Sequence, residues 1–125
     1  NVYSAVATPS QYAALVAFDN GMEAMMAMKK EYKKRRDFLV SRINEMDKIS
    51  CIMPKGAFYV FANIKKTGLS AEEFADRLLE KEHVAVIPGS NFSKNASGYV
   101  RISYGTSMEK IEDGLNRMER FLKSL

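Results

Sequence analysis

Arg101 is the residue whose type and position most clearly suggest that this sequence binds a ligand. It stands in the middle of the apolar run 100–104, and side chains of an extended strand alternate between the two faces of a sheet. Arg101 and Ser103 therefore share one face, while the larger residues of the run share the opposite face, which we expect to be the core. A covered guanidinium needs an anionic partner, and its planar fork suits a carboxylate bound through two hydrogen bonds. The alternative, which spacing alone favours slightly, is an internal salt bridge or a solvated sheet face.

Other residues with aromatic or reactive side chains have simpler structural explanations. Phe58 and Tyr59 lie on opposite faces of an expected strand at 57–64, so one of them could line a ligand site, although core packing explains both. His83 stands at the end of an expected helix, where it can cap carbonyls or favour the helix dipole when protonated. Cys51 lies in an apolar strand, so we expect it to behave as a small hydrophobic residue.

The composition excludes several classes of protein. The 125 residues are 46% hydrophobic and 27% charged, which is ordinary for one globular domain. The sequence contains no run of 18 apolar residues, so we expect no helix that crosses a membrane. With one cysteine and one histidine, an internal disulfide is impossible and we expect no metal site, because zinc sites take several such ligands. The single thiol is typical of a reduced, cytoplasmic setting.

A basic run on an expected helix has two competing explanations. It could bind nucleic acid or another acidic partner. It also fits the solvated face of a helix, since Glu31 and Asp37 dilute its charge, and we favour this second explanation and expect no nucleic-acid partner. The members of the run are Lys29, Lys30, Lys33, Lys34, Arg35 and Arg36.

The elements that would position these residues follow from the spacing of apolar side chains. Their order is ααββαββα, which predicts an α+β fold with a small, largely antiparallel sheet covered by helices. A long helix at 22–46 would span about 37 Å, enough to link two domains. The strand at 57–64 is apolar on both faces and is expected at the centre of the sheet. Helices are expected to begin at Thr8, Met22, Ser70 and Thr106, and strands to cover 49–53, 57–64, 84–87 and 99–104.

Polar residues at the helix starts predict how the helices are capped. Thr8 is expected to cap the first helix, with Gln11 reaching back to it. The sequences SAEE at 70–73 and TSME at 106–109 are expected capping boxes. The last helix is expected to pack through Ile111, Leu115, Met118, Leu122 and Leu125.

Three motifs occur in an order and spacing that match a known enzyme family. They read PKGAFYVF at 54–61, VAVIPGSNF at 84–92 and GYVRISY at 98–104, and they lie between a long helix and a closing amphipathic helix. Together they resemble the C-terminal part of class I/II aminotransferases, pyridoxal-phosphate enzymes of fold type I that are aspartate-aminotransferase-like. The resemblance covers essentially the whole chain. The family usually continues the second motif with Phe-Gly, where this sequence has Phe92-Ser93.

The resemblance implies roles for three residues of this chain. Arg101 matches the arginine that binds the α-carboxylate of the substrate, and Phe58 matches a phenylalanine that approaches substrate and cofactor. Ser4 lies in a segment that reaches toward the active site of the partner subunit. In this family the lysine that forms the Schiff base with the cofactor lies upstream of the matched part, so no catalytic lysine is expected in this chain.

The resemblance therefore implies that the chain is a fragment, about the last third of an aminotransferase. Residues 1–21 would belong to the side of the missing large domain, and 22–125 would form the small C-terminal domain with its linking helix 22–46. The full enzyme would be a cytoplasmic homodimer that uses pyridoxal 5'-phosphate to transfer an amino group between an amino acid and a 2-oxo acid. The fragment alone would bind no cofactor and be inactive. The alternative is a free-standing binding module for amino acids or keto acids, without catalysis.

Overall fold

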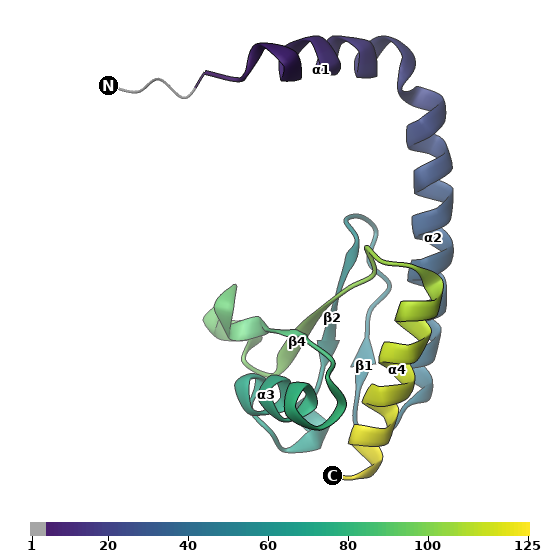
Figure 1. The fold of residues 1–125 in the computed structure, drawn as a ribbon. Coiled ribbons are helices and arrows are strands. Elements are labelled where there is room, and N and C mark those ends of the chain that lie inside the picture. Colours follow the sequence, from purple (N-terminus) through teal and green to yellow (C-terminus); the bar gives the residue numbers. More distant parts are fainter. Residues whose placement is uncertain (1–4) are drawn as a thin grey trace. The chain divides into compact units, whose positions relative to one another are not determined.

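The computed structural model describes residues 5–125, in which helices pack on one face of a four-stranded sheet (Figure 1). The predicted α+β class and the predicted order of elements are both confirmed. The longer elements are α1 (Thr8–Asn20), α2 (Met22–Glu45), β1 (Ser50–Cys51), β2 (Tyr59–Asn63), α3 (Ala71–Glu82), β3 (Ile87–Pro88), β4 (Tyr99–Ser103) and α4 (Met108–Lys123), and the short 3₁₀ turns are η1 (Lys65–Thr67), η2 (Gly89–Asn91) and η3 (Lys94–Ala96).

The sheet is antiparallel throughout and has the strand order β1-β2-β4-β3. Strand β2 therefore lies inside the sheet, as its apolar sequence predicts. Its neighbour β4 is also an inner strand, and the register pairs Phe61 of β2 with Arg101 of β4. Val60 and Ala62 are buried, whereas Phe61 between them is 39% exposed. One face of the sheet is thus the core, and the other carries apolar residues such as Phe61 and Ile87 that stay partly exposed.

Contacts divide the chain within α2 into two units, residues 1–31 and 32–125. In the first unit no residue of the described part 5–31 is buried. The second unit contains the sheet, α3, α4 and the rest of α2, together with every buried residue of the described range 5–125. To which domain of a longer protein each unit belongs stays a prediction.

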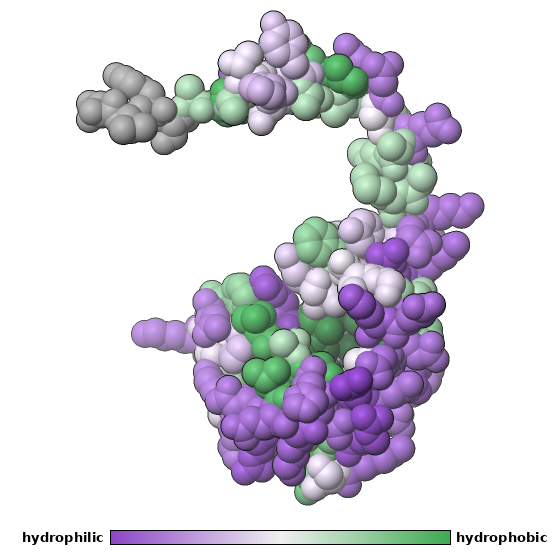
Figure 2. All heavy atoms as spheres, in the orientation of Figure 1, coloured by the Kyte–Doolittle hydropathy of each residue, from purple (hydrophilic) through white to green (hydrophobic). Residues whose placement is uncertain are grey.

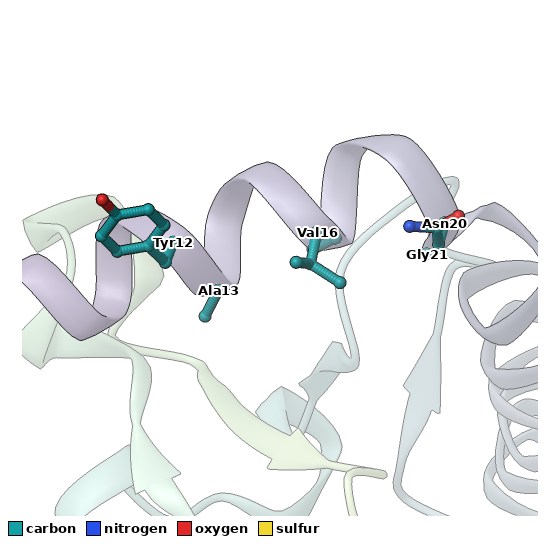
Figure 3. Close-up of a pocket in the computed structure, with 6 residues that line it drawn as sticks. Tyr12, Ala13, Val16, Asn20 and Gly21 are labelled. Atoms are coloured by element: carbon teal, nitrogen blue, oxygen red, sulfur yellow. The ribbon is translucent and has the colours of Figure 1, made fainter.

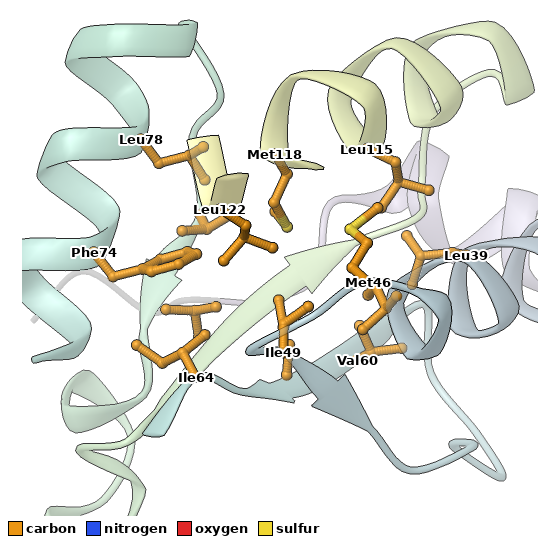
Figure 4. Close-up of a cluster of buried hydrophobic side chains, with 14 of the residues drawn as sticks. Leu39, Met46, Ile49, Val60, Ile64, Phe74, Leu78, Leu115, Met118 and Leu122 are labelled. Atoms are coloured by element: carbon orange, nitrogen blue, oxygen red, sulfur yellow. The ribbon is translucent and has the colours of Figure 1, made fainter. Parts of the chain in front are cut away.

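The core of the second unit forms where three helices meet one face of the sheet (Figure 4). Side chains from the end of α2, from α3 and from α4 converge there on residues of β2 and its flanks. This burial of apolar surface is the main source of stability for the unit. The labelled core residues are Leu39, Met46, Ile49, Val60, Ile64, Phe74, Leu78, Leu115, Met118 and Leu122.

The capping predictions are partly confirmed. Ser70 caps α3, and its hydroxyl oxygen accepts a hydrogen bond from the amide of Glu73 at 3.1 Å. The cap predicted at Thr8 is wrong, because Thr8 is already helical and Gln11 donates to the Val6 carbonyl instead, at 2.8 Å. The cap of α4 lies one residue later than predicted, at Ser107. Ser107 has an extended backbone, and its hydroxyl oxygen accepts a hydrogen bond from the amide of Lys110 at 3.4 Å.

Two other predictions need correction. Leu125 is 37% exposed, and Phe121, which the sequence analysis did not place in the core, is buried instead. The strand predicted at 84–87 is reduced to Ile87 and Pro88 in the ladder with β4. Val86 is buried nonetheless, so the apolar pattern that predicted a strand reflects packing and not strand pairing.

Replacing Gly114 with alanine should stabilise the chain. Gly114 lies inside α4, and a Cβ added there would meet no heavy atom within 4 Å. Because glycine weakens a helix interior, the variant should gain about 0.5–1 kcal/mol in free energy of unfolding, measured by urea titration. Gly89→Ala is the matched control and should lower the free energy of unfolding, because its Cβ would lie 2.3 Å from the Ala96 carbonyl oxygen. A loss of stability in Gly114→Ala would contradict the prediction.

Cys51 should react slowly with alkylating agents while the chain is folded. The side chain is half-buried against the core, and burial raises the pKa of its thiol from 9.0 to about 11. Two pKa units reduce the reactive thiolate at pH 8 about a hundredfold. The check is the rate of iodoacetamide labelling at pH 8, compared with that of the same chain unfolded in urea. Equal rates would show that Cys51 is not shielded.

Candidate functional site

Arg101 projects from the middle of β4 onto the sheet face opposite the core. Its register partners are Phe61 on β2 and Ile87 on β3. Cross-strand partners share a face, so the guanidinium-bearing side chain has an apolar neighbour on each side. The buried Val100 and Tyr104 lie on the other face, which is the alternation that the sequence predicts.

Two aromatic rings flank the guanidinium of Arg101. Its central carbon lies 4.3 Å from the centroid of the Tyr59 ring and 4.6 Å from that of the Phe92 ring. At these distances each ring attracts the cation through its negative face. Phe61 in turn meets the ring of Phe92 edge to face, with centroids 5.7 Å apart. Core packing, which the sequence favoured for Tyr59, is therefore wrong for this residue, and nothing in the sequence predicted that Phe92 contacts Arg101.

Among residues 5–125, no carboxylate pairs with Arg101 and no acceptor receives a hydrogen bond from its guanidinium. Of the two alternatives that spacing alone favoured, the internal salt bridge is therefore wrong for this part of the chain, and the solvated sheet face stays open. A half-buried guanidinium with open in-plane donors suits an external anion. Its fork geometry favours a carboxylate bound through two parallel hydrogen bonds.

Phe58 contacts Tyr59, which in turn contacts Arg101, and it lies outside the core. Its ring contacts Tyr59, with centroids 4.4 Å apart, and stacks on Tyr32 of α2 at 6.0 Å. It is 41% exposed, so core packing does not explain this residue. The proximity makes Phe58 available to a ligand that approaches Arg101, and its role in binding stays a prediction.

Tyr104 holds the turn before β2 in an unusual conformation. Ala57 has a φ of 60°, in the left-handed region that costs energy for any residue except glycine. The hydroxyl of Tyr104 donates to the Ala57 carbonyl at 2.8 Å, and its amide donates to the Phe58 carbonyl at 2.9 Å. Burial raises the pKa of the Tyr104 hydroxyl, which keeps it protonated as a donor. Sequence reasoning placed Tyr104 in the core but gave no signal of this bond.

The basic run of α2 has mixed surroundings. Its four lysines are exposed, as the solvated-face explanation predicts. Arg36 is different, because it pairs with Asp37 at 2.7 Å and donates to the Pro54 carbonyl at 3.2 Å. For this residue the solvated-face explanation is wrong, since its side chain ties α2 to the turn that leads into β2.

The remaining candidates do not join the Arg101 site. His83 ends α3 with a left-handed backbone, and its amide donates to the Leu79 carbonyl at 3.0 Å. Ser4 lies outside the described residues. Within residues 5–125, no group of three or more acidic, histidine or cysteine side chains is arranged to hold a metal ion. None of the helices in the same part of the chain has the length and apolar character needed to cross a membrane.

A separate apolar hollow runs along α1 (Figure 3). Gly21 closes its end, where a Cβ would lie 2.4 Å from the Ala17 carbonyl oxygen. No ionised group lines the hollow, so it offers packing surface and no evident chemistry. Its lining residues are Tyr12, Ala13, Val16, Ala17, Asn20 and Gly21.

Comparisons with known proteins agree with one another. The family described as aminotransferase class I and II matches residues 1–118. The putative aminotransferase YugH of Bacillus subtilis is 48% identical over 122 residues, which are 96% of this chain and 31% of that protein. The crystal structure of an aromatic aminotransferase from Pyrococcus horikoshii superposes with a TM-score of 0.88 at 46% identity, over 91% of this chain and 31% of that one.

A PLP-bound putative aminotransferase from Clostridium difficile is also similar, with a TM-score of 0.80 at 27% identity over 85% of this chain and 28% of that one. The chain thus spans about 30% of the length of the relatives that it matches.

Proposed function

Because the chain belongs to the class I and II aminotransferase family, we propose that it is the carboxylate-binding part of a longer aminotransferase. That enzyme would transfer an amino group between an amino acid and a 2-oxo acid. The observation that carries the proposal is the Arg101 guanidinium, flanked by aromatic rings and paired with no described residue. An unpaired cation of this shape suits the α-carboxylate that every amino-acid and 2-oxo-acid substrate carries.

The chain's own residues would bind and orient the substrate. Arg101 would hold the α-carboxylate through two in-plane N–H donors, which fixes the direction of the bond to the α-carbon. The rings of Tyr59 and Phe92 would keep water from the sides of the guanidinium, and a drier site strengthens the ion pair. Phe58 would line the path by which substrate and cofactor approach, and Ser4 would reach toward the partner subunit's active site.

The residues around Arg101 do not form a cofactor site by themselves. When bound, pyridoxal phosphate withdraws electrons from the α-carbon of an attached amino acid. It needs a lysine for covalent attachment and donors for its phosphate, whereas the residues that contact or flank Arg101 are aromatic or aliphatic. We therefore assign cofactor binding to a part of the enzyme outside these 125 residues, and we expect the chain alone to be inactive and to bind no cofactor.

The first unit would pack against the missing large domain. Figure 2 shows hydrophobic atoms at the surface along α1 and the start of α2, an apolar surface of the kind that marks an interaction site. We assign residues 1–21 to the large-domain side and 22–125 to the small domain, within a cytoplasmic homodimer. The large exposed hydrophobic residues here are Val6, Tyr12, Leu15, Val16, Phe18, Met22, Met25, Met26 and Met28.

The test of this proposal is the size of the native protein in its source cells, measured by immunoblot with an antibody raised against this chain. A band about three times the 14.1 kDa of the chain would support the enzyme, since the relatives are about three times longer. A single band near 14 kDa would overturn it. Arg101 would then belong to a free-standing binding module for amino acids or keto acids.

A further inference from the structure

We propose that Tyr59 and Phe92 are positioning residues that hold the Arg101 guanidinium in the plane that receives the carboxylate. The expected effect on substrate binding rests on the proposed function, whereas the expected effect on the order of the Arg101 side chain does not. A positioning residue acts through another residue, so neither ring needs to touch the substrate.

No polar contact within residues 5–125 fixes the orientation of this guanidinium. No described acceptor binds its N–H groups, and an arginine side chain that nothing restrains keeps a large rotamer entropy. The two rings at 4.3 and 4.6 Å are the contacts that restrict it. A planar guanidinium stacks on aromatic rings through its own faces, and contacts of this kind leave free the edge whose donors bind a carboxylate bidentately.

The rings are themselves held in place by other aromatic side chains. Phe61 contacts the ring of Phe92 edge to face, with an interplanar angle of 79°. On the other side, Phe58 lies against Tyr59 and stacks on Tyr32. The aromatic cluster thus extends from α2 across β2 to the loop after β3, with Arg101 between its two ends.

The loop that carries Phe92 is pinned by its backbone. The amide of Phe92 donates to the Gly89 carbonyl at 2.9 Å. Gly89 is buried, and a Cβ there would lie 2.3 Å from the Ala96 carbonyl oxygen and 2.7 Å from that of Tyr99. The loop therefore sits so close to the start of β4 that only glycine fits.

A side-chain hydrogen bond ties the same loop to α3. Ser90 donates to the carboxylate of Glu72, and this bond is the main cause that lowers the pKa of Glu72. A loop fixed to both α3 and β4 can hold Phe92 over Arg101 before any ligand arrives, which reduces the cost of ordering the site on binding.

The experiment measures the order of the Arg101 side chain in the 125-residue chain by ¹⁵N relaxation of its Nε–H group. In Phe92→Leu and Tyr59→Leu the Nε order parameter should fall into the flexible range, below about 0.6. Phe92→Tyr and Tyr59→Phe keep a ring and should preserve the order. Phe18→Leu, at a position 89% exposed on α1, is the matched control and should change nothing.

Backbone amide spectra show whether each variant is folded. If Tyr59→Leu unfolds, the order of Arg101 in Phe92→Leu tests the proposal, because Phe92 is half-exposed on a loop. Unchanged Arg101 order in a folded Phe92→Leu chain would overturn the proposal. So would a loss of order in Phe92→Tyr equal to that in Phe92→Leu, because the ring would then not be the cause.

A second readout in the full-length enzyme links the inference to substrate binding. Phe92→Leu should raise KM for the amino-acid donor by about three- to thirtyfold, the range of one cation–π contact, while kcat changes much less. If the Arg101 side chain loses order but KM does not rise, the proposal that the rings position Arg101 stands. The proposal that Arg101 binds the substrate carboxylate is then contradicted. The two proposals therefore fail in distinguishable ways.

Discussion

In the full-length enzyme, Arg101→Lys is expected to raise KM for the amino-acid donor and to lower kcat. The ammonium group of lysine is a point charge, and it cannot offer the two parallel donors of the guanidinium edge. The loss of transition-state stabilisation should be about 2–4 kcal/mol, which is a 30- to 1000-fold decrease in kcat/KM. Steady-state kinetics with a saturating 2-oxo-acid acceptor measure both constants.

The control for this substitution is Arg77→Lys on α3. Arg77 pairs with Glu73 at 2.6 Å on an exposed helix surface, and such pairs contribute little to stability. Arg77→Lys should therefore leave both kinetic constants unchanged. Wild-type kinetics in Arg101→Lys, with the thermal midpoint preserved, would remove Arg101 from the substrate site.

The features that the sequence predicts well are those set by neighbouring residues along the chain. The Ser70 cap depends on a hydroxyl and an amide three residues apart, and that spacing is written in the sequence. The placement of Arg101 on the non-core face follows from the alternation of one strand. The central position of β2 follows from its apolar residues on both faces.

The features that the sequence does not predict depend on contacts between distant segments. Tyr59 reaches Arg101 only because β2 and β4 pair in one particular register, and no local pattern sets that register. Phe92 reaches it because the loop after β3 folds back over β4, an approach that the buried Gly89 permits. Apolar residues recur every seven positions along α2 at Met25, Tyr32 and Leu39, and they show the same limit, since Leu39 is buried but Met25 is exposed. The pattern predicts an apolar face without naming what covers it.

The largest effect on stability is expected from Phe74→Ala. Phe74 of α3 is fully buried, and its ring meets the edge of Phe121 on α4, with centroids 5.3 Å apart. Truncation removes buried apolar surface and leaves a cavity between the two helices, so the free energy of unfolding should fall by about 3–5 kcal/mol. Urea unfolding of the 125-residue chain, followed by circular dichroism, measures the change.

The same substitution should also disturb the Arg101 site from a distance, because α3 carries the Glu72 carboxylate that holds Ser90 in the loop of Phe92. A loosened α3 would free that loop, and the order of the Arg101 side chain should fall along with stability. Phe18→Ala, at an exposed position, should change stability by less than about 0.5 kcal/mol and leave Arg101 unaffected. If Phe74→Ala lowers stability while Arg101 keeps its order, then β4 alone positions the loop, and the tie between Ser90 and Glu72 contributes nothing to the site.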